Sequence, residues 1–230
     1  MKHALPFEVN EKGDITLRNS EQLREDGYRD MAKWMEQAEK IFLKKREDKS
    51  GRASLVEWTD YQGQLTVQNL KQRHIVLYNS VGKNVSAAHF DRHSRKLPLM
   101  VDQRTYWAAF SDSREAEYLV GILNSRTANQ MIKPFQSMGL LGERDIHKKL
   151  LELPIPLFDA NNPLHKKLAD LSVDAGNEAA RAVKAKEFPR KMLARQREYV
   201  RANIQPILKE IDVLVKQVFQ ATQDAMKAKP

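Results

Sequence analysis

The sequence predicts an α+β fold: a small mixed, mostly antiparallel β-sheet with flanking helices, followed by a hairpin of two long C-terminal helices. Short segments rich in β-branched and aromatic residues recur between residues 55 and 110, separated by loops of Gly, Asn, Asp or basic residues. Apolar residues then recur at three- and four-residue steps over 112–132 and 163–219, as in helices with one buried face. We divide the chain into an N-terminal lead-in (1–50), a central domain (51–160) and a helical hairpin (161–230).

The lead-in begins with two short predicted strands within Leu5–Arg18, around a turn at Glu11–Asp14. A long helix follows, capped by Ser20, with Trp34 in its apolar set. We expect Trp34 to pack in a core or an interface, because large aromatic side chains are usually well buried. The helix ends near the charged segment Lys44–Arg52, which marks the first domain boundary.

Six short segments are expected to be strands of the central sheet. Two loops between them, Asn79–Asn84 and Asp91–Lys96, combine turn residues with side chains that can reach phosphates or base edges. The predicted strands are Leu55–Trp58, Gln64–Val67, Ile75–Tyr78, Val85–Phe90, Leu97–Val101 and Tyr106–Phe110.

Two short helices should follow the sheet. Asp112 and Glu115 form a pair like a capping box at the start of the first helix, which ends at Asn124. Ser125 can accept a backbone N–H hydrogen bond at the start of the second helix, which reaches Lys133.

Residues 133–158, KPFQSMGLLGERDIHKKLLELPIPLF, carry helix, turn and strand signals in close succession. Gly139 and Gly142 predict a loop, and Glu143–Leu153 predicts a helix with acids in its first turn and lysines near its end. The prolines that follow predict an extended segment at Leu153–Leu157. The apolar residues expected to act as scaffold are Phe135, Leu140, Leu141, Ile146, Leu150 and Ile155.

The C-terminal hairpin is predicted from two long apolar stripes. Asn162 fits the cap of the first helix, with Pro163 at its first position. We expect Pro189 near the first turn of an intervening helix, and Pro206 to kink or restart the last one. Because the apolar stripe is wider than a surface helix requires, the hairpin is expected to dock against another domain or subunit, and it allows self-association.

The charge of the chain points to a polyanionic partner. Its 230 residues carry a net charge of +9, with a pI near 9.6 and a mean hydropathy of -0.62. Seven Lys or Arg against two acids lie between Asn69 and Thr105, and the same excess lies between Lys184 and Arg201. No apolar run approaches the roughly 20 residues of a membrane span, and Met1–Val9 has no signal-peptide core.

Several kinds of chemistry are missing from the sequence. There is no cysteine, so disulfides and thiolate metal sites are excluded and a reducing cytoplasm is expected. Walker, GxGxxG and HExxH motifs are absent, and the acids form no convincing nuclease cluster. His147 and His165 each stand beside a lysine on a predicted helix, and we expect them to be surface or capping histidines.

The order of residues from Ile122 to Leu171, ILNS…N…IKPFQSMGLLGERDIHKKLLELPIPLFD…NPLHKKLADL, resembles the target recognition domains attached to adenine-specific DNA methyltransferases of restriction-modification systems. The likeness is chiefly to single-chain type II restriction-methyltransferase fusions, more distantly to type I specificity subunits, and spans roughly residues 55 to 220. It implies a domain that reads base edges through loops of its sheet. Double-stranded DNA and a separate methyltransferase or nuclease domain are the partners it implies, in the prokaryotic cytoplasm at the nucleoid.

The resemblance does not extend to catalysis. The chain has neither a Gly-rich loop for an adenosyl cofactor nor an Asn-Pro-Pro-aromatic loop for a flipped base, and Asn162-Pro163 is followed by Leu-His. We therefore expect a fragment or subunit that is no enzyme on its own, with no catalytic residue, cofactor or metal in this chain. S-adenosylmethionine is implied only for the separate methyltransferase domain.

The resemblance assigns DNA contacts to polar and basic loop residues. Arg can bind guanine and Asn or Gln adenine through paired hydrogen bonds, whereas Lys mostly holds phosphates. For Arg144 an ion pair with Asp145 or another acid is an equally good interpretation. The predicted contact residues are Lys71, Gln72, Arg73, Lys83, Asn84, Arg92, His93, Arg95, Lys96, Gln136, Arg144, Lys148 and Lys149.

Two other functions remain open at this point. The chain could be a helical interaction or assembly module whose positive charge is incidental, which predicts a stable oligomer and weak DNA binding without sequence preference. It could also be a metal-dependent nuclease whose active site has no recognised motif, which predicts magnesium-dependent cleavage of plasmid DNA.

Overall fold

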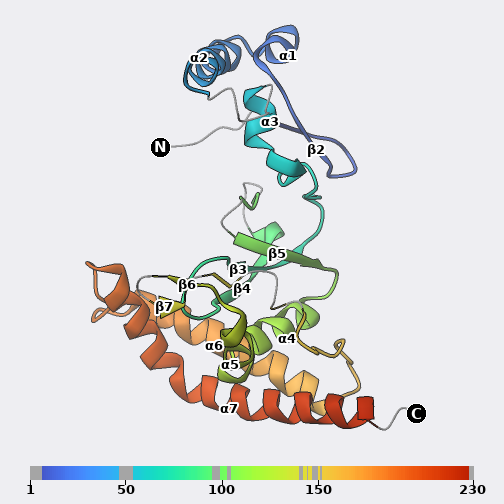
Figure 1. Cartoon of the computed structure of the whole chain (residues 1–230), viewed down its shortest axis with the longest axis vertical. Helices are drawn as coiled ribbons and strands as arrows, with labels where there is room; N and C mark the ends of the chain where they lie inside the picture. Colours follow the sequence, from blue (N-terminus) through green and yellow to red (C-terminus); the bar gives the residue numbers. More distant parts are fainter. Residues whose placement is uncertain are drawn as a thin grey trace. The chain divides into compact units, whose positions relative to one another are not determined.

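A three-stranded antiparallel sheet occupies the middle of the chain (Figure 1). Its central strand β3 (His74–Asn79) pairs with β4 (Ala87–Asp91) on one side and with β5 (Thr105–Phe110) on the other. The predicted strands at 75–78, 85–90 and 106–110 are confirmed. Their β-branched and aromatic residues bury one face, with Val76 and Tyr78 in the core beneath the sheet.

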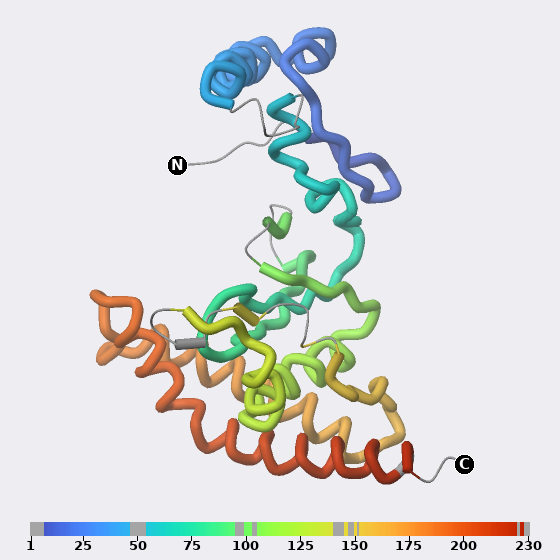
Figure 2. The backbone as a smooth tube through the Cα atoms, viewed as in Figure 1, coloured from blue at the N-terminus to red at the C-terminus, as the bar shows by residue number. Residues whose placement is uncertain are grey.

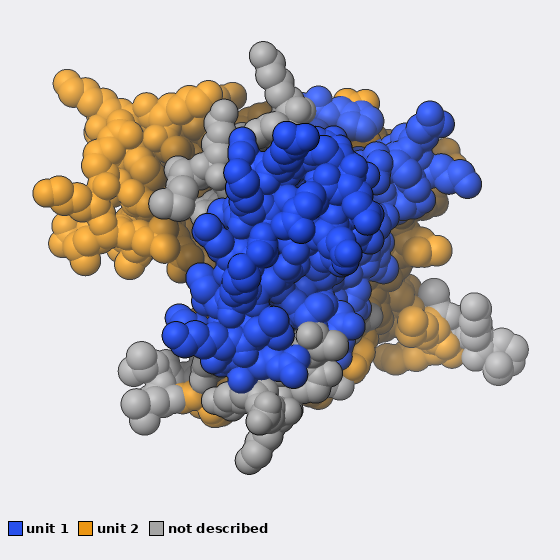
Figure 3. All heavy atoms as spheres, turned by 90° about the horizontal axis from the view of Figure 1, so that it is seen from above, with its two compact units in different colours: residues 1–72, 92–103 blue, residues 73–91, 104–230 orange. Residues whose placement is uncertain are grey.

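The structure is a computed structural model that describes residues 7–46, 54–94, 99–102, 105–139, 142–143, 145–146, 150 and 152–227. The chain forms two compact units, coloured separately in Figure 3. The first unit holds residues 1–72 and 92–103, and the second holds 73–91 and 104–230. This division differs from the sequence-based one, because residues 51–72 and 92–103 belong with the N-terminal elements and the C-terminal hairpin belongs to the same unit as the sheet. Among helices in the described ranges, none is both long and apolar enough to cross a bilayer.

Two helices pack against the sheet as predicted. The Asp112 side chain accepts from the backbone N–H of Arg114 at the start of α4 (Ser113–Asn124). Ser125 ends that helix and accepts from the N–H of Ala128, which caps α5 (Arg126–Ile132). Both caps satisfy backbone donors that have no partner inside a helix.

The two longest helices form the predicted C-terminal hairpin, α6 (Pro163–Lys184) and α7 (Leu193–Lys227), drawn in orange and red in Figures 1 and 2. The Asn162 side chain accepts from the N–H of Leu164, with Pro163 in the first turn, as the sequence predicted. The apolar stripes of both helices and of α4 enclose one core, which includes Tyr118, Ile122, Leu168, Ile211, Val215 and Phe219.

The two proline predictions have different outcomes. Pro189 lies in the loop between α6 and α7, four residues before the helix starts, so it does not begin a helix. Pro206 lies inside α7, which continues through it, so the restart is wrong and the kink stays a prediction. The packing of α7 against α6 and α4 compensates for the single backbone hydrogen bond that a proline removes.

The first unit begins with the predicted hairpin, β1 (Phe7–Val9) paired with β2 (Ile15–Leu17). The single long helix expected next is two helices, α1 (Ser20–Glu25) and α2 (Arg29–Lys45). Gly27, at a φ of 85°, separates them in a left-handed conformation that ends a helix.

Further expectations for the first unit were wrong in detail. Asn19, not Ser20, caps α1 and forms a capping box with Gln22. Trp34 is 55% exposed and lies outside the core of this unit, so core packing is wrong and packing in an interface stays a prediction.

The segments predicted as strands at 55–58 and 64–67 are not strands. Leu55–Thr59 forms helix α3, because the Ser54 side chain accepts from the N–H of Glu57 and starts a helical turn. A 3-10 turn, η2 (Tyr61–Gly63), follows. The Asp60 carboxylate then accepts from the backbone of Leu65 and from Thr66, which holds residues 64–67 in turns. Residues 99–102 carry no strand either, and 97–98 lie outside the described residues.

The described residues between 133 and 158 form 3-10 turns, short strands and extended segments, and none of them lies in an α-helix. A 3-10 turn, η4 (Lys133–Phe135), leads to a two-stranded ladder of β6 (Met138–Gly139) and β7 (Gly142–Glu143). Glu143 therefore starts no helix, and residues 144, 147–149 and 151 of the predicted helix lie outside the described part. The scaffold role is confirmed for Ile146, Leu150 and Ile155, which belong to the second unit's cores. It is wrong for Phe135, which is exposed, and residues 140–141 are not described.

Candidate nucleic-acid interface

The loop that joins β3 to β4, residues 80–86, is fixed by the side chain of Asn79. Its Nδ2 donates to the carbonyl oxygens of Val81 (2.9 Å) and Asn84 (3.2 Å), and its Oδ1 accepts from the N–H of Ser86 (2.7 Å). One amide therefore satisfies three backbone groups of the loop. Such Asx contacts hold a turn in a single conformation.

A second set of contacts fixes the β3–β4 loop from outside. The Asn129 Oδ1 of α5 accepts from the N–H of Val85 (2.7 Å), and the Gln136 Nε2 donates to the carbonyl of Gly82 (3.1 Å). Ile146 donates its N–H to the carbonyl of Ser80 (3.1 Å), next to a bridge between Val81 and Asp145. The stretch 133–158 thus includes residues that support this loop.

Lys83 and Asn84 at the tip of the loop are available for contacts outside the protein. Lys83 is exposed and Asn84 is half-buried at the tip of the loop. Neither side chain makes a hydrogen bond or ion pair with another residue of the described ranges. A cation and an amide thus project from a backbone that is held in place, which is the arrangement that phosphate binding and base reading require.

The predicted contact residue Arg73 lies at the other end of the sheet. It precedes β3, whereas Lys83 follows it, so the strand separates the two. The Arg73 guanidinium donates to both oxygens of Asp91 (2.9–3.1 Å), and this carboxylate raises the pKa of Arg73. Arg73 is already paired, although its side chain is half exposed.

Arg92 does not have the exposed position expected of a base reader. It is 4% exposed, and its guanidinium donates to the carbonyl of Asn69 (2.6 Å) and to Gln68 Oε1 (3.2 Å). Gln68 in turn holds both backbone groups of Val101. Burial lowers the pKa of Arg92. Arg92 therefore joins two segments of the first unit and belongs to the scaffold.

The other predicted contact residues are distributed over both units. Lys71, Gln72 and His93 are exposed in the first unit. Gln136, in the second unit, is buried, so its role is to hold the β3–β4 loop, and its Oε1 has no hydrogen-bond partner in the described part of the chain. The remaining predictions lie outside the described residues: Arg95, Lys96, Arg144, Lys148 and Lys149.

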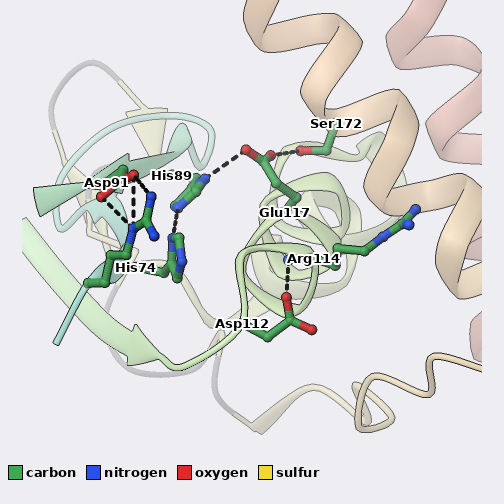
Figure 4. A network of polar contacts seen from close by, with 8 residues as sticks. His74, His89, Asp91, Asp112, Arg114, Glu117 and Ser172 are labelled. Carbon is green, nitrogen blue, oxygen red and sulfur yellow. Dashed lines mark hydrogen bonds and ion pairs between the residues drawn. The ribbon is translucent and has the colours of Figure 1, made fainter. Parts of the chain in front are cut away.

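A buried polar network that the sequence did not reveal joins the sheet to two helices (Figure 4). Glu117 of α4, as a carboxylate, accepts from His89 Nδ1 (2.8 Å) and from the Ser172 hydroxyl of α6 (2.8 Å). The other ring nitrogen of His89, Nε2, forms a hydrogen bond with His74 Nδ1 (3.0 Å).

The network connects strands β3 and β4 to helices α4 and α6. The Ser172 hydroxyl donates to Glu117 and not to an imidazole, so no histidine activates it as a base would. An open pocket of about 230 Å³ adjoins the network, lined by His89, Glu117 and the paired Arg114 and Asp170. In the described ranges, no three His, Asp or Glu residues converge as a metal site would require.

His165 is buried, so it is not the surface histidine that was one of the two expectations. Its Nδ1 accepts from the N–H of Asp159 (3.1 Å), and its ring clusters with those of Tyr118 and Phe158, with centroids 4.7 and 6.3 Å away. It therefore caps a turn, as one of the two expectations had it. His147 is not described.

No protein-family model matches this chain. A search of curated proteins finds no match either.

Acid should destabilise the second unit through its buried histidines. Burial lowers the pKa of His74. His89 and Arg73 lower this pKa further, whereas Asp91 and Asp112 raise it. Burial also lowers the pKa of His165. The stabilisation by these histidines is therefore fully present above pH 6.5, the ordinary pKa of histidine. It falls as the pH drops below that value, because the unfolded chain takes up protons first.

We expect each histidine to contribute a slope of at most about 1.4 kcal/mol per pH unit below about pH 6.5. Urea unfolding at a series of pH values measures this slope. The double variant His74→Gln and His165→Asn keeps a donor and an acceptor at these positions and should flatten the curve. An unchanged slope in the variant would contradict the assignment.

Proposed function

We propose that this chain is a sequence-specific double-stranded DNA recognition module that positions a separate adenine methyltransferase domain. The observation that carries the proposal is that hydrogen bonds fix the β3–β4 loop in one conformation. At its tip, Lys83 and Asn84 have no side-chain partner in the described part of the chain. The resemblance of residues 122–171 to target recognition domains supports the same function.

The chemistry of the loop suits a DNA groove. A loop at the end of two antiparallel strands can reach into the major groove, and the β3–β4 loop lies at one end of the three-stranded sheet. At its tip, the Asn84 amide offers one donor and one acceptor, the pair that binds the N6 and N7 edge of adenine, and Lys83 can hold a neighbouring phosphate. A fixed loop reads bases more selectively than a loose one, because its side chains lose less freedom on binding.

The partner domain would dock on the helical hairpin. Valine side chains remain exposed on both helices, Val173 and Val183 on α6 and Val213 on α7. Exposed apolar residues on long helices favour a protein partner. The same residues favour the second candidate function, a helical assembly module. It predicts a stable oligomer of the isolated chain and DNA binding without sequence preference.

Selection from a randomised duplex library at low and moderate salt, with sequencing of the bound fraction, tests the proposal. We expect the intact chain to enrich one short motif. The double variant Lys83→Ala and Asn84→Ala should lose this motif, with about tenfold or more weaker binding to the selected duplex, since one paired base contact is worth about 1–3 kcal/mol.

The matched control removes one lysine and one asparagine from the exposed surface of α6, Lys166→Ala and Asn177→Ala. It should enrich the same motif as the unaltered chain. Binding that is sensitive to salt but enriches no motif would overturn sequence-specific recognition. If the Lys83 and Asn84 variant enriched the motif fully, the β3–β4 loop would not be part of the DNA interface.

A further inference from the structure

The tip of the α6–α7 hairpin, residues 184–201, carries more than half of the net charge of the protein. Seven basic residues face two acids here, Glu187 and Glu198, which leaves five of the nine net positive charges in 18 residues. All seven are exposed: Lys184, Lys186, Arg190, Lys191, Arg195, Arg197 and Arg201. The tip is drawn in orange at the left of Figure 2.

These cations lack carboxylate partners in the described part of the chain. Elsewhere on the same hairpin, two basic residues do pair along the helix, Arg181 with Glu178 (2.8 Å) and Lys216 with Asp212 (3.2 Å). At the tip, the Arg190 guanidinium instead lies over the ring of Phe188, 5.9 Å from its centroid. Like charges this close repel one another, so the tip would be stabilised by a polyanion.

The backbone of the tip has a defined conformation. The Phe188 ring meets Tyr199 edge-on with centroids 6.0 Å apart, and the Gln196 Nε2 donates to the carbonyl of Pro189 (2.9 Å). Met192, at a φ of 65°, turns the chain into α7. The cations therefore extend from a closed turn and from the first turns of a helix.

The distribution of the cations favours a phosphate backbone over a membrane. Arg197 and Arg201 are four residues apart and share one face of α7, whereas Arg195 lies on nearly the opposite face. A helix that lies on a membrane needs one apolar face opposite one basic face, and this segment lacks that separation. Cations around a projecting tip can contact phosphates on either side of it.

We propose that the hairpin tip is a second DNA-binding site, which holds backbone phosphates without reading sequence. The proposal rests on the proposed function for the identity of the polyanion and adds a site to it. The β3–β4 loop would select the sequence, and the tip would supply most of the salt-dependent affinity.

The test compares two quadruple variants with the same change in net charge. The tip variant is Arg190→Gln, Lys191→Gln, Arg195→Gln and Arg197→Gln. The control neutralises exposed lysines of the same hairpin outside the tip, Lys166→Gln, Lys167→Gln, Lys209→Gln and Lys227→Gln. Glutamine has a helix propensity close to those of Lys and Arg, so circular dichroism should show intact helices in both.

The dissociation constant for a duplex is measured between about 50 and 200 mM salt. Removing one cation that binds a phosphate should reduce the slope of log K against log salt by about 0.9, so the slope should fall by about 2–3 in the tip variant and by less than one in the control. An equal slope in the two variants would overturn the proposal. Binding of the intact chain to anionic lipid vesicles but not to duplex would overturn it too.

Failure of this site and failure of the proposed function give different results. If the intact chain enriches a motif and the tip variant keeps its salt slope, the tip is not a DNA site while sequence recognition stands. If no motif is enriched but the slope falls in the tip variant, the tip is a DNA site and sequence-specific recognition is wrong. With both correct, the tip variant binds all duplexes more weakly and still enriches the same motif.

Discussion

Replacing Leu168 by alanine is expected to lower the free energy of unfolding of the second unit by about 2–5 kcal/mol. Leu168 is 0% exposed in the core between α4, α6 and α7. The helices approach so closely here that a Cβ added at Gly121 would lie 3.1 Å from the Leu168 side chain. Neighbours this tightly packed cannot collapse into the space that the shortened side chain leaves, so a cavity remains.

Urea unfolding of the intact chain measures the effect. Leu157→Ala is the matched control, because this leucine is 87% exposed and the same atoms are removed from solvent-exposed surface. The control should change the free energy of unfolding by less than about 0.5 kcal/mol. Equal effects for the two leucines would contradict the packing of α6 on α4 and α7.

Replacing Arg92 by alanine should destabilise the first unit by about 2–3 kcal/mol. The change leaves the carbonyl of Asn69 without its guanidinium donor and takes one donor from Gln68, which itself holds Val101. Hydrogen bonds from a charged group contribute about 1.5–3 kcal/mol each, and buried acceptors without a partner are costly. Residues 92–103 would then detach from residues 64–72.

Amide hydrogen exchange of peptides from residues 64–72 measures this local destabilisation. Arg24→Ala is the control in the same unit, because Arg24 forms an exposed ion pair with Glu36, which is worth about 0–1 kcal/mol. If Arg92→Ala left exchange unchanged and weakened DNA binding directly, the sequence-based assignment of Arg92 as a reader would be correct after all.

Elements set by short-range chemistry could be predicted from the sequence. The caps at Asp112, Ser125 and Asn162 accept hydrogen bonds from residues two or three positions ahead, so the side chain and its partner fall within one turn. The strands around residues 75–78 and 106–110 follow from their own β-branched and aromatic residues.

The errors arise where a neighbouring or distant residue outweighs local propensity. Leu55–Trp58 has strand-forming residues, but the Ser54 cap makes it helical. Glu143 begins a helix-like pattern, yet pairing with Met138 in β6 and β7 places it in a strand. The burial of Arg92 depends on Gln68, 24 positions earlier, which composition and periodicity do not reveal.

The candidate interface, too, could be predicted from the sequence only in part. Loop residues Lys83 and Asn84 could be proposed from charge and turn chemistry alone. The contacts that fix their loop could not, because Asn129 and Gln136 lie 44 and 54 positions away from their partners. The network from His74 to Ser172 likewise depends on strand register and helix packing, so no sequence spacing reveals it.

Amide hydrogen exchange with and without the selected duplex tests the central claim most directly, because it shows which surface meets the DNA. The account predicts that saturating duplex slows exchange in residues 80–86, with the Lys83 and Asn84 variant showing much less protection in the same peptide. Unchanged exchange in residues 80–86 at saturating duplex, with protection elsewhere in the chain, would contradict recognition by the β3–β4 loop.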